Sequence, residues 1–244
     1  KTHPDYTVAP MSVCSAMSQG YIGYDLQNAV RAELLKRGIF KTVSTILTQV
    51  IVDPYDDAFH HPVKVIGRYM DAKEAEAEEQ KGNYVKEEPG KGYRRIVAAP
   101  MPKSIVEIDA IKTLVQNDQV VIACGGGGIP VLQQGNELKA IIEKDYASGK
   151  LAEGVDADIL MILTNDKMVD IDRDTEHPRF LEHITVEEAK EHIAADQFGV
   201  NSMLPKICAS VDFITAGRGR SAIITNLENA IDALKGKTGT IITE

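Results

Sequence analysis

Apolar runs of strand length alternate with amphipathic stretches of helix length along most of this 244-residue chain. Runs rich in β-branched residues and bounded by Gly, Pro, Asn or Asp are typical of buried strands. Five such runs occur, at residues 42–52, 120–122, 158–163, 221–226 and 239–243. Because helical patterns separate most of them, the order predicts an α/β fold, in which helices cover both faces of a mainly parallel sheet.

The first helix is predicted to begin at Ser12, a suitable N-cap, and to end at Gly38, a residue suited to the position after a helix. Its core face would be an apolar stripe made of Val13, Met17, Tyr21 and Tyr24. Gly20 and Gly23 lie inside this helix, where each costs about 1 kcal/mol relative to alanine. We therefore interpret both glycines as positions of close packing or of approach to a ligand.

Two later helices have the start signal of a capping box, a Ser or Thr followed three residues later by Glu. Ser104 and Glu107 predict a helix to about residue 117, and Thr185 and Glu188 predict one to about residue 194.

Two more helices are expected near the carboxyl end of the chain. Ser202 would cap a helix that ends at Gly217, with Ile207, Val211 and Ile214 on its core face. A last short helix before Gly236 would carry an apolar stripe made of Leu227, Ile231 and Leu234.

Residues 53–98 differ in character from the rest of the chain. They combine proline and glycine punctuation with an acidic run at 71–80, which we interpret as an exposed helix face. We expect an α/β domain made of residues 1–52 and 99–244, with 53–98 as a small protruding subdomain. His60 and His61 are expected in a loop and not in a metal site, because no second cluster offers ligand spacing.

Charge and cysteine content narrow the class of protein. A net charge of -9 and the lack of a Lys/Arg-rich run argue against a nucleic-acid partner. Cys14, Cys124 and Cys208 are odd in number and widely spaced, which favours reduced thiols in the cytoplasm. No run has the length of a membrane span, and because the chain opens without an initiator Met we expect a leading portion before Lys1.

Four consecutive glycines directly follow the apolar run 120–122, namely Gly125, Gly126, Gly127 and Gly128. Parallel sheets place ligands at the carboxyl ends of their strands, and glycine allows the left-handed conformations that turn successive amides toward an anion. The segment predicts a phosphate cradle, and a flexible turn is the alternative. It matches neither a P-loop nor a dinucleotide fingerprint.

Three lysines stand out as candidate partners of an anion. Lys144 precedes Asp145 at a predicted helix start, where a surface ion pair is the alternative. Lys206 falls in a predicted first turn, where a cation opposes the helix dipole, so either a nearby anion or simple exposure would explain it. Lys64 lies in an apolar patch of the acidic segment 53–98.

The segments CGGGGIP, IIEKD, NSMLPK and AIITNLEN, with MSQGYIGY near the start, together resemble the carbamate kinases of the amino acid kinase family over essentially the whole chain. The resemblance implies a three-layer αβα sandwich with a protruding subdomain. It also implies a cytoplasmic homodimer that transfers phosphate reversibly between ATP and carbamate with Mg²⁺. Such enzymes usually form ATP from ADP and carbamoyl phosphate in arginine fermentation, the arginine deiminase pathway.

The resemblance also implies roles for individual residues. Lys144 matches a lysine that contacts the transferred phosphoryl group, and Asp145 matches the aspartate that organises the lysines of the site. Lys206 matches a lysine on the nucleotide phosphates, and Lys64 resembles a lysine that the subdomain extends over the carbamoyl phosphate. The four glycines match a loop that lines the phosphate and carbamate region, and nucleotide binding is expected at Ser202, Met203 and Thr164.

Two departures from the family pattern leave alternatives open. The family begins with a Gly-Gly-Asn strand end and a Gly-Asn-Gly-Pro loop, and neither occurs in the sequence. TNDKMVDID, which begins at Thr164, also differs from the usual Thr-Gly/Asp-Val-Asp pattern near the nucleotide. The alternatives are another amino acid kinase, acting for example on acetylglutamate or a nucleoside monophosphate, and a nucleotide-binding relative without catalysis.

Overall fold

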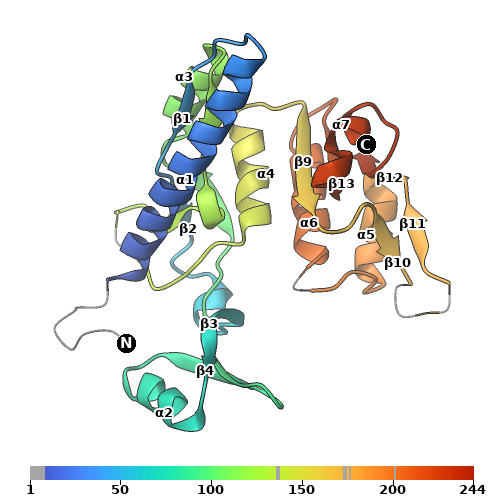
Figure 1. Cartoon of the computed structure of the whole chain (residues 1–244). Coiled ribbons are helices and arrows are strands. Elements are labelled where there is room, and N and C mark those ends of the chain that lie inside the picture. The colour runs from blue at the N-terminus through green and yellow to red at the C-terminus, as the bar shows by residue number, and fades with distance from the viewer. Residues whose placement is uncertain (1–8, 136–137, 173–174, 176, 201) are drawn as a thin grey trace. The chain divides into compact units, whose positions relative to one another are not determined.

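A computed structural model describes residues 9–135, 138–172, 175, 177–200 and 202–244. The chain divides into two compact units, Lys1–Lys144 and Asp145–Glu244 (Figure 1). The boundary falls at the first residue of helix α4 (Lys144–Gly154). No composition shift marks this boundary, so the sequence did not predict it. A subdomain at residues 53–98 stays a prediction.

The N-terminal unit contains short parallel strand pairs beside a long helix. β1 (Val43–Thr45) pairs in parallel with β7 (Val120–Ile122), and β2 (Gln49–Val52) pairs in parallel with β8 (Ile129–Val131). β2 also pairs antiparallel with β6 (Pro102–Ile105). The predicted strand 42–52 is thus interrupted at residues 46–48. There the side chain of Gln19 accepts a hydrogen bond from the N–H of Thr48 and donates one to its carbonyl oxygen, which also accepts from the N–H of Ile129.

The long helix α1 (Met11–Lys36) is confirmed, but its predicted core face and N-cap were wrong. Its buried residues are Ser12, Gln19 and Gly23, and the stripe expected in the core is exposed: Val13, Met17, Tyr21 and Tyr24. Ser12 lies inside the first turn, not at the cap. Only small or extendable side chains suit the face that packs on the strands, since a Cβ on Gly23 would lie 2.2 Å from Cγ2 of Thr45.

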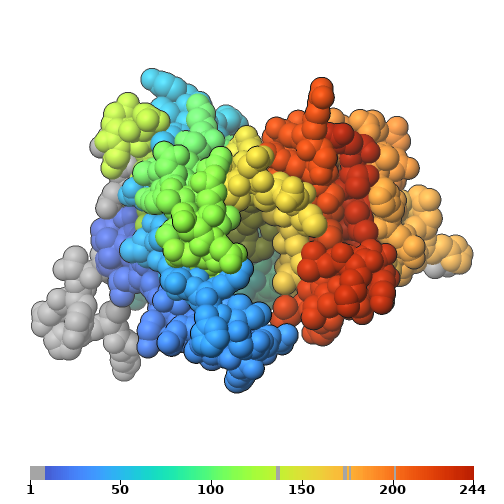
Figure 2. Space-filling model, turned by 90° about the horizontal axis from the view of Figure 1, so that it is seen from above, coloured from blue at the N-terminus to red at the C-terminus, as the bar shows by residue number. Residues whose placement is uncertain are grey.

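Helix α3 (Ile108–Gln116) lies beside the carboxyl end of α1 (Figure 1 and Figure 2). Lys41, which follows α1, forms an ion pair with Asp118, which follows α3. The predicted capping box at its start was wrong. Ser104 belongs to β6, and the carboxylate of Glu107 accepts a hydrogen bond from the backbone N–H of Gln49.

Within residues 53–98, three strands form a sheet of their own in the order β3-β5-β4, with bounds Lys64–Met70 (β3), Tyr84–Glu88 (β4) and Gly92–Val97 (β5). Helix α2 (Ala72–Gln80) has Ala75 as its buried residue, which confirms the prediction of an exposed acidic helix. It begins with a capping box between Asp71 and Glu74. A 3₁₀ turn, η1 (Asp57–Phe59), precedes this sheet.

The C-terminal unit has a four-stranded sheet in the order β12-β14-β13-β9, with bounds Ile159–Thr164 (β9), His183–Thr185 (β12), Ser221–Asn226 (β13) and Thr240–Thr243 (β14). The pairs β9/β13 and β12/β14 are parallel. A separate hairpin is formed by β10 (Val169–Ile171) and β11 (Arg179–Leu181). The helices are α4, α5 (Val186–Ala194), α6 (Leu204–Thr215) and α7 (Ala230–Leu234), with a 3₁₀ turn, η3 (Leu227–Asn229), before α7.

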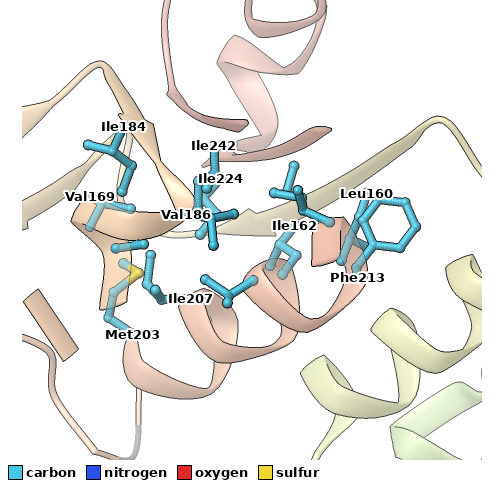
Figure 3. Packing of buried hydrophobic residues seen from close by; sticks show 14 of the residues in the cluster. Leu160, Ile162, Val169, Ile184, Val186, Met203, Ile207, Phe213, Ile224 and Ile242 are labelled. Atoms are coloured by element: carbon cyan, nitrogen blue, oxygen red, sulfur yellow. The ribbon is translucent and has the colours of Figure 1, made fainter. Parts of the chain in front are cut away.

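The core of this unit lies between the sheet and α6. Ile224 and Ile242 from the sheet meet Ile207 and Phe213 from α6 (Figure 3). Ile223 is also buried but lies outside this cluster, because successive side chains of a strand point to opposite faces of the sheet. Helix α7 also packs on β13. Helices therefore cover both faces of the sheet, and the predicted α/β fold is confirmed.

The C-terminal helices confirm one capping prediction and correct another, and they also correct a predicted buried stripe. Thr185 and Glu188 form the predicted capping box of α5. Ser202 does not cap α6, which begins at Leu204. The last apolar stripe is exposed, because α7 packs through the small residue Ala233: Leu227, Ile231 and Leu234. Within the described ranges, every helix is too short or too polar to span a bilayer.

Candidate functional site

The four glycines, here called the glycine loop (residues 125–128), form a tight and well-packed turn after β7. Gly125, Gly126 and Gly127 make a 3₁₀ turn, η2 (Gly125–Gly127), and Gly126, Gly127 and Gly128 have φ values of 67°, 101° and 84°. A Cβ on Gly127 would lie 2.3 Å from the carbonyl oxygen of Ile142. A Cβ on Gly128 would lie 2.4 Å from Cγ2 of Val50.

The loop has two halves with different surroundings. Gly127 and Gly128 are buried against their neighbours, whereas Gly125 and Gly126 are exposed, and a Cβ on Gly126 would meet no atom within 4 Å. Close packing therefore explains the second pair of glycines. The first pair leaves backbone accessible to an anion, which supports the cradle over a flexible turn.

Thr48 and Gln19 fix the start of the loop, and neither was predicted as a site residue. The buried Thr48 accepts a 2.9 Å hydrogen bond on Oγ1 from the N–H of Cys124. Its own N–H donates to Oε1 of Gln19 at 2.8 Å, and its carbonyl oxygen accepts from Nε2 of Gln19 at 3.2 Å. Two features of the sequence could have pointed to these residues. Thr48 and Gln49 are a polar pair inside an apolar run, and Gln19 is a polar residue among small residues of the first helix.

A cavity of about 270 Å³ opens beside the exposed half of the loop. Its walls are mostly apolar and come from α1, from Thr45 at the end of β1 and Ile46 after it, and from Ile122 and Ala123 before the glycines. Gly125 and Gly126 also line it. The cavity gives a ligand room to reach the exposed glycine amides.

Lys64, the first residue of β3, forms an ion pair with Glu143. The two side chains are 29% and 25% exposed, so the pair is partly sheltered from water. Glu143 directly precedes Lys144 and follows Ile142, whose carbonyl lies against Gly127. In the N-terminal unit, the segment 140–143 therefore lies between the glycine loop and Lys64.

Lys206 and Asp145 form a buried ion pair in the C-terminal unit. Nζ of Lys206 lies 3.1 Å from Oδ2 of Asp145, and the side chains are 11% and 8% exposed. Lys206 also donates to the carbonyl oxygen of Ser202 at 3.0 Å. The aspartate is the anion that explains a cation in the first turn of α6, and simple exposure of Lys206 was the wrong alternative.

Helix α4 brings Asp145 to this position. As predicted, Lys144 and Asp145 begin a helix, with Lys144 exposed and Asp145 buried. A Cβ on Gly149 would lie 3.2 Å from the carbonyl oxygen of Ala209, so α4 and α6 approach closely at that point. Asp145 is thus part of a buried contact between two helices, not of a surface pair.

A second cavity, of about 240 Å³, lies at the amino end of α6. Ser202 and Met203 line it together with Asp170 of β10 and the apolar side chain of Phe198. Thr164, the third residue assigned to the nucleotide, ends β9 and is not among the lining residues. The structure therefore brings two of the three predicted nucleotide residues to one cavity.

The buried thiol of Cys124 directly precedes the glycine loop. Burial, with the nearby carboxylate of Glu107, raises the pKa of Cys124 to about 12, so its thiol stays protonated at neutral pH. His61 contacts the carboxylate of Asp57. In the part of the chain that the structure describes, no group of three His, Cys, Asp or Glu residues is arranged to hold a metal ion.

Comparison with known proteins gives consistent matches. The sequence model of the amino acid kinase family matches residues 16–226. Carbamate kinase from Clostridium perfringens is 50% identical over 237 residues, 96% of this chain and 76% of that protein. The Escherichia coli carbamate kinase-like protein YqeA is 49% identical, over 99% of this chain and 79% of that protein. A structure of carbamate kinase from Giardia lamblia bound to AMP-PNP has a TM-score of 0.91 and 37% identity, covering 98% of this chain and 77% of that one.

Proposed function

The chain belongs to the amino acid kinase family, and we propose that it is a carbamate kinase that transfers a phosphoryl group reversibly between ATP and carbamate. One structural observation carries the proposal further than the comparisons do. The buried Lys206–Asp145 pair lies in the first turns of two helices, and the carbonyl oxygen of Ser202, which lines the 240 Å³ cavity, accepts a hydrogen bond from the same lysine. This arrangement supports the proposal that Lys206 is the cation for the nucleotide phosphates.

The nucleotide is proposed to occupy that cavity. Met203 and Phe198 offer soft and aromatic surface for a base, and Ser202 offers a hydroxyl group. Lys206 would then meet the phosphates, with Asp145 holding its ammonium group in a fixed direction. Thr164 stays a proposed nucleotide contact on the strength of the family resemblance alone.

The proposed reaction needs positioning and charge neutralisation, and it needs no covalent nucleophile. A carbamate oxygen is already anionic, so no general base is required. On the family resemblance, Lys64, Lys144 and Lys206 would each offset charge on the transferring group, and backbone amides of the glycine loop would bind its oxygens. Asp145 would act by orienting Lys206.

Mg²⁺ is proposed to accompany the nucleotide. This ion is usually bound by substrate phosphates plus one or two carboxylates and not by a dedicated protein cage. When bound, the ion would neutralise charge on the phosphate oxygens, and no protein ligand is assigned to it.

A homodimer is proposed from the family resemblance, and the outer face of α1 supports it. Val13, Met17, Tyr21 and Tyr24 are exposed along this face. An apolar stripe of this kind on a soluble protein marks an interaction site. We also propose a cytoplasmic protein that works in the direction of ATP formation in arginine fermentation, on the resemblance alone.

Formation of ATP from ADP and an acyl phosphate tests the proposed function. The intact protein is incubated with ADP, Mg²⁺ and carbamoyl phosphate, acetyl phosphate or acetylglutamyl phosphate, and ATP is measured by luciferase. The proposal predicts rapid ATP formation when carbamoyl phosphate is the donor, and slow or no formation with the other two donors. A preference for another donor would favour a different amino acid kinase, and binding of ADP without turnover would favour a non-catalytic relative.

A further inference from the structure

Three consecutive charged residues, Glu143, Lys144 and Asp145, carry the two ion pairs described above. Asp145 pairs with Lys206, and Glu143 pairs with Lys64. The family resemblance assigns a role to Asp145 and to each lysine, but it assigns none to Glu143. The placement of Glu143 therefore needs its own explanation.

Backbone contacts fix Glu143 relative to Lys64. Lys64 is paired with Val97 across the ladder of β3 and β5. The next residue, Ala98, forms a parallel bridge with Ala140, and its carbonyl oxygen accepts a 3.1 Å hydrogen bond from the N–H of Ile141. Both members of the ion pair are thus tied to the end of the same strand, so their meeting follows from the fold.

The same segment also lies against the glycine loop. The carbonyl oxygen of Ile142 occupies the space that a side chain at Gly127 would need. A lysine has a flexible four-carbon stem and loses conformational freedom when its ammonium group is fixed. A carboxylate on the segment that packs against the loop therefore restrains the ammonium group of Lys64 next to this segment.

We propose that Glu143 is a positioning residue for phosphoryl transfer, which holds Lys64 beside the glycine loop through a charge pair. Partial burial limits screening of the pair by water, so its charge matters more than in a fully exposed pair. Glu143 does not contact the reacting atoms in this role and acts only through Lys64. The inference rests on the proposed carbamate kinase function.

The catalytic test compares Glu143→Gln in two backgrounds. Glutamine keeps the size of the side chain and removes its charge. We expect Glu143→Gln to lower kcat for ATP formation about 10-fold or more while KM for ADP changes little, because misplacement of a catalytic group acts mainly on turnover. In a Lys64→Ala background the same substitution should change kcat less than about 2-fold.

Glu143→Asp and Glu78→Gln are the matched controls. Glu143→Asp keeps the charge on a shorter side chain and should recover part of the lost kcat. Glu78 is a carboxylate of similar exposure in the same unit, 20% against 25%, and it pairs with Lys81 and Arg95. Glu78→Gln should therefore leave kcat unchanged.

A second readout does not depend on activity. Acylation of Lys64 by acetic anhydride, followed by peptide mass spectrometry, should be several-fold faster in Glu143→Gln than in the wild type, whereas Lys150 should react equally in both. A wild-type protein that forms no ATP refutes the proposed function and the catalytic role of Glu143 with it. Unchanged acylation of Lys64, or equal kcat losses in both backgrounds, refutes the Glu143 inference alone.

Discussion

Adjacent glycines of the loop after β7 differ in what surrounds them, and this difference predicts their tolerance to substitution. Gly127→Ala combines a φ of 101° with a Cβ 2.3 Å from a carbonyl oxygen, so we expect a loss of about 2–5 kcal/mol in the free energy of unfolding. Gly126→Ala meets open space and should cost about 1–2 kcal/mol, for the left-handed backbone alone. Urea unfolding of both variants measures this, and equal losses would contradict the packing described for Gly127.

The three cysteines should differ in reactivity. Cys14 is exposed, whereas Cys124 is buried with a pKa raised to about 12, and burial also raises the pKa of Cys208. Because only the thiolate reacts, iodoacetamide at pH 8.5 should label Cys14 first, Cys208 slowly and Cys124 only after unfolding. Mass spectrometry of the peptides reads the order, and early labelling of Cys124 would contradict its burial.

The same raised pKa gives a pH dependence of stability. The Cys124 thiol is neutral in the folded protein up to about pH 12, whereas an unfolded thiol ionises near its ordinary value of 9.0. The contribution of this group to stability is therefore complete below pH 9 and is lost progressively between pH 9 and about 12. Cys124→Ser should reduce that loss, which urea unfolding at pH 8 and pH 10.5 would show.

The positions of individual candidate residues were predictable where local sequence determines them. Lys144, Asp145 and Lys206 were recognised from their motifs and from their places at helix starts. Local sequence does not reveal the pairing of Asp145 with Lys206, because that pairing depends on how α4 packs on α6 at Gly149. Gln19 and Thr48 were missed for a similar reason, since their hydrogen bonds join residues far apart in the chain.

Two glycines in helix α1 test the face by which this helix packs. A Cβ on Gly23 would clash with Thr45, whereas a Cβ on Gly20 would meet no atom within 4 Å. Gly20→Ala should therefore stabilise the protein by up to about 1 kcal/mol through helix propensity, and Gly23→Ala should destabilise it by about 1–3 kcal/mol. Thermal unfolding of the two variants is the measurement, and stabilisation by Gly23→Ala would refute the packing.

The capping box of α5 gives a further prediction for a single element. Thr185→Ala removes a side chain that accepts a hydrogen bond from the N–H of Glu188. The substitution should lower the free energy of unfolding by about 1 kcal/mol. Ser202→Ala should lower the free energy of unfolding by only a few tenths of that amount, because Ser202 does not cap α6. Comparable losses in urea unfolding would contradict the cap assignment.

Elements were predicted well in position and less well in orientation. The capping box at Thr185 was confirmed because its two partners, Thr185 and Glu188, lie three residues apart in one helical turn. The similar signal at Ser104 failed because pairing of Ser104 with Ile51 takes that residue into β6. In α1, apolar residues occur around much of the helix, so periodicity did not identify the buried face, which close packing of Gly23 decides.

At the scale of the whole molecule, the outer face of α1 predicts the oligomeric state. Tyr21→Glu places a charge in the exposed apolar stripe and should convert the proposed homodimer into a monomer, since a buried unpaired charge in an interface costs several kcal/mol. Lys36→Glu, at the polar end of the same helix, should leave the mass unchanged. Light scattering after size-exclusion chromatography measures the mass, and a wild-type monomer would contradict the proposal.

The fold class followed from the alternation of strands and helices, but the division into two units at Lys144 did not. This boundary falls at the start of a helix, inside the short charged run 143–145, with no proline or glycine to mark it, and only the contacts within each unit reveal it. The family assignment from motifs spread along the chain is confirmed by the amino acid kinase model, which matches residues 16–226.

The rate of ATP formation from ADP and carbamoyl phosphate, compared between the wild type and Lys206→Ala, tests the central claim most directly. A carbamate kinase that uses Lys206 on the phosphates predicts rapid turnover in the wild type and a loss of roughly 10²- to 10³-fold in the variant. Lys144→Ala, at an exposed position, should show a similar loss with an unchanged fold by circular dichroism. No ATP from the wild type, or a near wild-type rate in a folded Lys206→Ala protein, would contradict the account.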